Sequence, residues 1–208
     1  MKNLFFLILS LLLFTSCSST KGVVKKYFSK KEVQLIMNYD NSKPMQVYKI
    51  SNKKDSLLLR TKSNYIKANP NNKVLQTFVK RLYATVRDSM SMGVGIAAPQ
   101  VGVLKNIIWV QRFDKENFPF EVYLNPKIIA YSTKKQTFKE GCLSIPNRLD
   151  TLYNRSYKIQ IEYDTMKAEH KTEFIEGLTS VIFQHEIDHL NGILYLDHLN
   201  KDVIEAKN

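Results

Sequence analysis

Residues 184–190 read Gln-His-Glu-Ile-Asp-His-Leu, so that His185 and His189 stand four positions apart with Glu186 beside the first. Residues four apart share one face of an α-helix, and two imidazoles placed in this way can bind one metal ion. Glu186 would then lie where a carboxylate can take a proton from an attacking water and deliver it to a leaving amine. The alternative is a pair of core histidines held by hydrogen bonds, but the chain has only four histidines and two of them flank this glutamate. The stretch therefore predicts a helix that carries a metal-dependent hydrolytic site.

A catalytic metal site keeps three protein ligands and one open position, so a third ligand has to be found. The usual completions of this motif fail, because no histidine stands six residues after His189 and the only later glutamate is close to the C-terminus. Upstream, residues 140–146 read Glu-Gly-Cys-Leu-Ser-Ile-Pro, and the thiolate of Cys142 would bind a divalent metal well. We expect a site built from Cys142, His185 and His189.

Three segments together resemble the motifs of the peptide deformylase family: Gly-Val-Gly-Ile-Ala-Ala-Pro-Gln at 93–100, the cysteine segment at 140–146, and the histidine segment at 184–190. They occur in the family's order and at compatible spacing, and the resemblance covers roughly Met45 to Leu199. It implies that Cys142, His185 and His189 hold the metal ion. It also implies that Glu186 acts first as general base and then as general acid.

The resemblance assigns further roles around the metal. It implies that the side chain of Gln100 and the backbone N–H of Leu143 polarise the formyl oxygen and stabilise the oxyanion, a contribution that is often the largest in acyl transfer. Gly93 and Gly95 are expected at the substrate, where the backbone can approach closely, with purely structural glycines as the alternative. Glu140 is expected near the substrate or as a carboxylate that orients a metal ligand.

Asp188 is a second candidate for such an orienting carboxylate. Either Asp188 or Glu140 could pair with a basic residue such as Arg148 or Arg155, and a merely solvated carboxylate is the alternative for both.

Hydrophobic patterns indicate an α+β fold. Apolar residues spaced three and four apart predict a helix from Lys73 to Met90. Strands are expected at 107–110, 121–124, 127–131 and 158–163, and a second long helical pattern runs from about Glu173 to Asn191. With the resemblance, this predicts a peptide deformylase-like fold in which antiparallel strands, one of them carrying Cys142, pack around a central HExxH helix.

The N-terminus resembles a bacterial lipoprotein signal. Lys2 precedes an apolar run from Leu4 to Phe14, which is short for a membrane span, and Cys17 stands where a cleavage site belongs. We therefore expect a signal peptide at 1–16, lipidation of Cys17, a basic tether at 17–44 with one short helix near 30–38, and the metal hydrolase domain at 45–208.

The formal net charge of +12 is concentrated near this terminus, because residues 18–81 carry fifteen Lys and Arg against three acidic residues. Such an excess could attract anionic lipid headgroups, although a solvated tether is the simpler interpretation. Nucleic-acid binding is not expected, since no basic motif interleaved with aromatic residues and no recognition helix appears.

The predicted reaction is removal of the formyl group from N-formylmethionyl peptides with release of formate. The resemblance implies one divalent ion, Fe²⁺ in the first place and Zn²⁺, Ni²⁺ or Co²⁺ otherwise. We expect a monomer that is exported and anchored by lipid, facing the periplasm or cell exterior, so a housekeeping role in translation does not follow. The alternatives are an exported metallo-amidase or peptidase of other specificity, and a non-catalytic lipoprotein that binds formyl peptides; intact Gln100 and Glu186 argue against the second.

Overall fold

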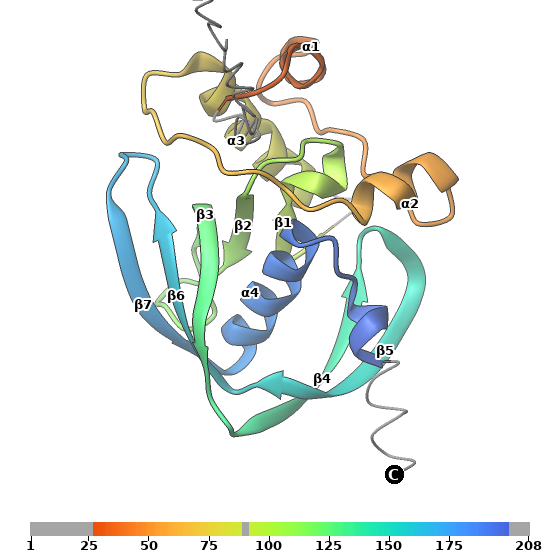
Figure 1. The fold of residues 1–208 in the computed structure, drawn as a ribbon, viewed down its shortest axis with the longest axis vertical. Helices are drawn as coiled ribbons and strands as arrows, with labels where there is room; N and C mark the ends of the chain where they lie inside the picture. The colour runs from red at the N-terminus through yellow and green to blue at the C-terminus, as the bar shows by residue number, and fades with distance from the viewer. Residues whose placement is uncertain (1–26, 89–91, 200–208) are drawn as a thin grey trace, which may run out of the picture.

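The computed structural model describes residues 27–88 and 92–199, and every structural statement below concerns these residues (Figure 1). In chain order the elements are α1 (Lys30–Met37), α2 (Lys53–Leu59), α3 (Lys73–Val86), β1 (Gly95–Ala97), the 3₁₀ turn η1 (Ala98–Val101), β2 (Ile107–Gln111), β3 (Phe120–Tyr131), β4 (Lys135–Cys142), β5 (Ile145–Ser156), β6 (Lys158–Asp164), β7 (His170–Glu176) and α4 (Gly177–Leu190). The segment 1–26, with the predicted signal peptide and Cys17, lies outside the described residues.

The strands form two antiparallel sheets. One has five strands in the order β1-β2-β3-β6-β7, and the other is a two-stranded sheet of β4 and β5, called here the β4–β5 ribbon. The two strands expected at 121–124 and 127–131 are one strand, β3, which has an irregularity in its pairing with β6 between Leu124 and Lys127. A bulge of this kind interrupts the alternation of side chains, which is why the sequence pattern resembles two separate strands.

Helix α4 lies between the five-stranded sheet and the β4–β5 ribbon (Figure 1). It contacts β1, β2, β3, β6 and β7 on one side and β5 on the other. Its apolar residues are buried on more than one face, and they include Val181, Ile182, Phe183, Ile187 and Leu190. A helix buried in this way leaves little water for its polar side chains, so each of them has to find a partner within the protein.

The start of α4 differs from the prediction. Residues 170–176 form β7, which pairs with β6 from Asp164↔His170 to Lys158↔Glu176, and the helix begins only at Gly177. Most side chains of β7 are exposed and Ile175 alone is buried, so this strand carries no clear period-two pattern in sequence. The first helix pattern is also shorter than expected, since α3 ends at Val86.

Residues 28–44 pack against the domain that was expected to begin near Met45. Helix α1 begins at Ser29 with a capping box, in which Ser29 and Glu32 satisfy each other's backbone N–H groups. Ile36 of α1 is fully buried in the same cluster as Met45 and Phe78. The predicted short helix near 30–38 is confirmed, but it belongs to the hydrophobic core rather than to a solvated tether.

Arg81 of α3 holds this segment in place. Its guanidinium is almost fully buried and donates to the backbone carbonyls of Leu35, Ile36 and Lys43 at 2.9 to 3.0 Å. Three carbonyl acceptors from a segment about 40 residues away fix α1 and the residues after it against α3.

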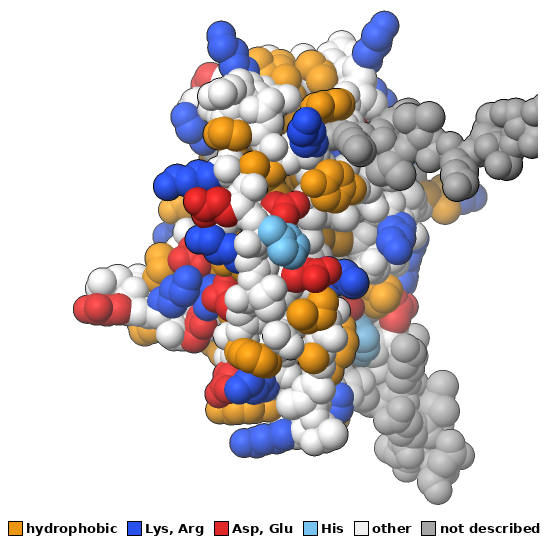
Figure 2. All heavy atoms as spheres, turned by 60° about the vertical axis from the view of Figure 1, so that its left-hand side comes forward, with side chains coloured by type: hydrophobic (Ala, Val, Ile, Leu, Met, Phe, Trp, Pro, Cys, Tyr) orange, Lys and Arg blue, Asp and Glu red, His pale blue; other side chains and the backbone are white. Residues whose placement is uncertain are grey.

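The outer surface of the large sheet is charged. Figure 2 shows acidic and basic side chains interspersed with apolar ones on the face that it turns forward. Salt bridges on the strands of this sheet and the turn before β7 include Lys127–Glu162, Lys158–Glu176 and Lys171–Glu169. In the described part of the chain, no helix has both the length and the apolar character needed to cross a bilayer.

Candidate metal centre and active site

The structure brings the three predicted metal ligands together. The ligand atoms of Cys142, His185 and His189 all lie within 4.8 Å of one another, and Cys142 Sγ is 3.2 Å from His189 Nε2. Cys142 is the last residue of β4, and both histidines project from α4 toward it. A thiolate and two imidazoles at such separations fit one tetrahedral ion with one position left open.

The electrostatics of the cluster favour metal binding. Burial alone would raise the pKa of the Cys142 thiol, but the neighbouring His189 and His185 outweigh burial and hold this pKa well below its usual value. The thiolate is the form of cysteine that coordinates a metal. A soft thiolate with two imidazoles is a donor set that suits iron, zinc, nickel and cobalt.

Glu186 lies beside the ligands and lines the same cavity. Its side chain is almost fully buried, and its Oε2 has no hydrogen-bond partner among the described residues. Burial raises the pKa of Glu186 to about 7, although the charges of His185 and His189 oppose the rise. A carboxyl group with a pKa near neutrality can both accept and donate a proton at physiological pH.

Gly95 makes room for this carboxylate. A Cβ at position 95 would lie 2.5 Å from Glu186 Oε1 and 2.9 Å from Ile182 Cγ2, closer than such atoms approach. At Gly93 the nearest atoms, from the side chains of Val86 and Leu143, would be 3.1 and 3.2 Å away. Both glycines line the cavity, and the closest atom to a Cβ at Gly95 belongs to Glu186.

Gln100 points its amide nitrogen toward the thiolate. Its Oε1 accepts a hydrogen bond from the Ala97 N–H at 2.8 Å, which fixes the orientation of the amide. Nε2 then lies 3.6 Å from Cys142 Sγ and 3.3 Å from Ser144 Oγ. Leu143, the other predicted oxyanion donor, follows Cys142 directly and lines the same cavity.

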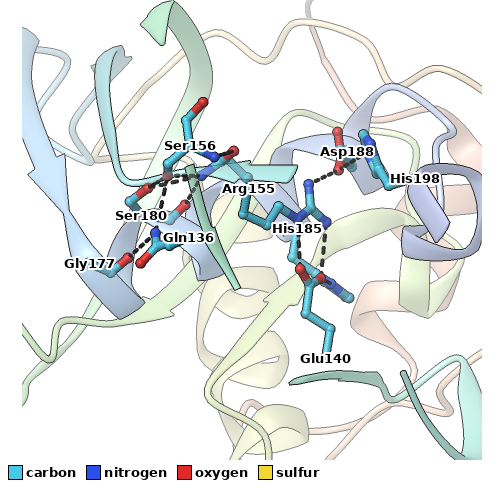
Figure 3. A network of polar contacts seen from close by, with 10 residues as sticks. Gln136, Glu140, Arg155, Ser156, Gly177, Ser180, His185, Asp188 and His198 are labelled. Atoms are coloured by element: carbon cyan, nitrogen blue, oxygen red, sulfur yellow. Dashed lines mark hydrogen bonds and ion pairs between the residues drawn. The ribbon is translucent and has the colours of Figure 1, made fainter. Parts of the chain in front are cut away.

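Glu140 orients one of the ligands. Its Oε2 lies 2.8 Å from His185 Nδ1, and Arg155 donates to both of its carboxylate oxygens at 2.7 and 3.0 Å (Figure 3). Burial would raise the pKa of Glu140, but His185 and Arg155 lower it to about 2. The ionised carboxylate binds Nδ1 and so turns the other ring nitrogen of His185 toward Cys142. Glu140 also lines the cavity, so its contacts fit both the expected place near the substrate and the expected role of orienting a ligand.

The same network continues away from the metal cluster. Arg155 also donates to Asp188 Oδ2 at 2.7 Å, and His198 Nε2 lies 2.8 Å from the same oxygen (Figure 3). Asp188 is therefore paired with Arg155, one of the two arginines considered. Arg148 instead pairs with Asp150 at the surface, at 2.7 Å.

A cavity of about 800 Å³ opens onto the metal cluster. Several exposed apolar side chains line it, and they are Met92, Val94, Phe138 and Leu149. Lys49 lines it as well, from a segment far from the motifs. Neither Lys49 nor His198 stands out in the sequence, because their contacts with the site depend on tertiary structure alone.

Comparisons with known proteins agree with this geometry. The model of the polypeptide deformylase family matches residues 45–204. The peptide deformylase of Leptospira biflexa is 36% identical over 163 residues, which are 74% of this chain and 89% of that protein. Peptide deformylase 2 of Bacillus cereus is 38% identical over 117 residues, which are 55% of this chain but only 64% of that relative's length.

Solved structures show the same architecture. The class I type b peptide deformylase of Acinetobacter baumannii with Met-Ala-Ser bound has a TM-score of 0.66 and 30% identity, covering 76% of this chain and 99% of that one. The same enzyme with actinonin bound has a TM-score of 0.65 at 30% identity, covering 75% and 98%. The predicted α+β, deformylase-like fold with antiparallel sheets is confirmed. The chain belongs to the peptide deformylase family.

Proposed function

We propose that this protein is a metal-dependent peptide deformylase that hydrolyses the formyl group from N-formylmethionyl peptides, with the HExxH segment of α4 as its catalytic motif. One observation carries the proposal: Cys142, His185 and His189 converge within 4.8 Å while Glu186 stands beside them with a free carboxylate oxygen. Relatives that bear the name peptide deformylase, and a related structure with Met-Ala-Ser bound, support the same reaction.

The three ligand side chains would hold one divalent ion, and we propose Fe²⁺, with Zn²⁺, Ni²⁺ or Co²⁺ as alternatives. Such an ion supplies Lewis acidity, which polarises a carbonyl oxygen and makes water a stronger acid. The residues around the site suit a metal ion, because Glu140 is hydrogen-bonded to Nδ1 of His185 and the pKa of the Cys142 thiol is lowered.

The protein's own groups carry the proton and stabilise the charge. Glu186 takes a proton from water as the oxygen attacks the formyl carbon, and Nε2 of Gln100 with the Leu143 N–H donates to the oxygen that becomes negative. When the C–N bond breaks, the same proton passes from Glu186 to the amine nitrogen. The products are formate and a peptide with a free amino terminus.

The test is formate release from formyl-Met-Ala-Ser by protein purified without oxygen and loaded with Fe²⁺, with acetyl-Met-Ala-Ser as the control substrate. We expect turnover of the formyl peptide, about one metal ion per chain, and loss of the metal in Cys142→Ala and His185→Ala. Binding of the formyl peptide without turnover would favour the non-catalytic alternative. Equal turnover of the acetyl peptide would favour an amidase of other specificity.

We also propose that the protein is an exported lipoprotein, with a signal peptide at 1–16, Cys17 lipidated, and a monomeric enzyme domain held at the membrane. The support is the sequence pattern from Lys2 to Cys17. Labelling by fatty acid and recovery in the membrane fraction are expected for the wild type and should be lost in Cys17→Ser. A wild type recovered wholly in a soluble fraction would contradict the anchor.

A further inference from the structure

Residues 48–50 run between the two segments that carry the proposed oxyanion donors. On one side, the Tyr48 N–H donates to the backbone carbonyl of Gln100 at 2.7 Å. On the other side, the Ile50 N–H donates to the carbonyl of Ser144 at 3.0 Å, and Lys49 Nζ donates to the carbonyl of Leu143. One three-residue segment is therefore hydrogen-bonded to η1 and to the residues that follow Cys142.

The acceptors of Lys49 and Ile50 are the two residues of a tight turn. Leu143 and Ser144 connect β4 to β5, and Cys142 pairs with Ile145 across this turn. The N–H and C=O groups of residues in such a turn lie beyond the strand ladder, so they have to find hydrogen-bond partners elsewhere. The Leu143 N–H is expected to stabilise the oxyanion, and its direction depends on the same turn.

The side chain of Lys49 is well placed to fix this orientation. It is half-buried and lines the cavity, and its own backbone N–H donates to Asp55 Oδ2 at 3.2 Å. An ammonium group donating to a carbonyl makes a charge-assisted hydrogen bond, which is roughly twice as strong as a neutral one. The residue is thus held at its backbone by α2 and at its ammonium group by the turn.

We propose that Lys49 is a positioning residue, which sets the orientation of the turn at 143–144 and so aims the Leu143 N–H and the thiolate of Cys142 into the site. Because Tyr48 holds the backbone of Gln100, the same segment sets the separation of the two oxyanion donors. The catalytic consequence rests on the proposed deformylase function, whereas the effect on the turn does not.

The test compares Lys49→Met, Lys49→Arg and a matched control, Lys54→Met. Lys54 is an exposed lysine of α2 in the same stretch that does not line the cavity, so its variant loses one charge without touching the turn. Hydrogen–deuterium exchange read by mass spectrometry over residues 142–146 should be about tenfold faster in Lys49→Met. It should stay at the wild-type rate in Lys54→Met and close to it in Lys49→Arg.

Activity on formyl-Met-Ala-Ser gives the second readout. A donor displaced by about 1 Å costs about 10²-fold, so kcat of Lys49→Met should fall about 10- to 100-fold with KM within about threefold and the metal retained. Lys49→Arg should recover most of kcat. If Lys49→Met did not fold, Lys49→Gln, which keeps a neutral donor, should show the same changes in smaller size.

Wild-type exchange over 142–146 in folded Lys49→Met, or in Lys49→Gln where that variant replaces it, would overturn the inference. Loss of kcat in Lys54→Met equal to that in Lys49→Met would overturn it as well. A wild-type protein that released no formate would contradict the proposed function instead. The exchange comparison would still decide whether Lys49 positions the turn.

Discussion

A single methyl group added at Gly95 tests whether the position of Glu186 sets the rate. The Cβ of Gly95→Ala would lie 2.5 Å from Glu186 Oε1, and ordinary van der Waals contact begins at 3.4 Å. The carboxylate therefore has to withdraw by about 0.9 Å, the difference between these two distances. Gly95 is not among the glycines with positive φ, so alanine adds no backbone strain.

The expected loss follows from this displacement. Moving a catalytic group by about 1 Å can cost about 10²-fold, and complete loss of a general base costs about 10²–10⁴-fold. We expect kcat of Gly95→Ala to fall about 10²-fold, which corresponds to about 2.7 kcal/mol of activation free energy at 1.36 kcal/mol per factor of ten. Metal binding should persist, because the atoms nearest to the new methyl group belong to Glu186 and Ile182 and not to the three ligands.

The assay measures kcat for formate release, metal content and thermal unfolding in wild type, Gly95→Ala and Gly93→Ala. A Cβ at Gly93 would meet Val86 Cγ2 at 3.1 Å and Leu143 Cδ1 at 3.2 Å, only slightly closer than ordinary contact at 3.4 Å, so a small adjustment is enough and less than about a tenfold loss is expected. If Gly95→Ala kept the wild-type kcat with metal bound, Glu186 would not be the group whose placement limits the reaction.

Three further outcomes follow from the structure. Glu186→Gln should keep the metal but lose about 10²–10⁴-fold or more in kcat. Gln100→Ala should lose less, about 10²–10³-fold, because a second oxyanion donor remains. A larger loss of kcat in Gln100→Ala than in Glu186→Gln would contradict the assigned roles. Arg155→Met removes the guanidinium partner of the buried Glu140 and of the partly buried Asp188, and it should lower the free energy of unfolding in urea by about 3–5 kcal/mol. A change below about 1 kcal/mol would show that the network adds little. Burial would raise the pKa of Asp114, but hydrogen bonds and charge from Arg112 outweigh burial and lower it. Its stabilisation is therefore present above the unfolded-state pKa of about 3.9 and lost as pH falls through the lower folded-state value, so the stability difference between wild type and Asp114→Asn should shrink between pH 6 and pH 3.

The metal ligands could be predicted because their geometry is local or chemically restricted. His185 and His189 lie one helical turn apart, so a short helix brings them together whatever the rest of the fold does. Cys142 could be predicted as a ligand because a catalytic metal site needs a third protein ligand, and the sequence lacks the downstream histidine or glutamate that commonly completes this motif. The helix itself was predicted too long, since the mostly exposed residues of β7 carry no buried alternation to mark them as a strand.

The hydrogen bonds and ion pairs that orient the metal ligands could not be predicted, because they depend on strand register. Glu140 meets Arg155 across the β4–β5 ribbon, whose pairing shifts between Gln136 and Phe138 and again between Gly141 and Cys142. A slip of one residue moves a side chain to the opposite face of a strand, so two such shifts decide which carboxylate and which arginine face α4. Nothing in the local sequence shows where the shifts occur.

The burial of α4 explains why the polar side chains of this helix are paired with side chains of the β4–β5 ribbon. Apolar neighbours surround the helix, so a polar side chain that it carries toward the ribbon destabilises the fold unless the ribbon supplies a partner. Glu140 satisfies His185, and Arg155 satisfies Asp188, so these pairs stabilise the fold and orient the site at once. Two polar atoms of α4, Glu186 Oε2 and His189 Nδ1, are buried without a hydrogen-bond partner among the described residues, and Glu186 is the one of these two residues that is not a predicted metal ligand. An unsatisfied buried oxygen costs about 1–3 kcal/mol, and this one lies on the wall of the cavity next to the metal ligands, where the proposed mechanism has the attacking water lose its proton.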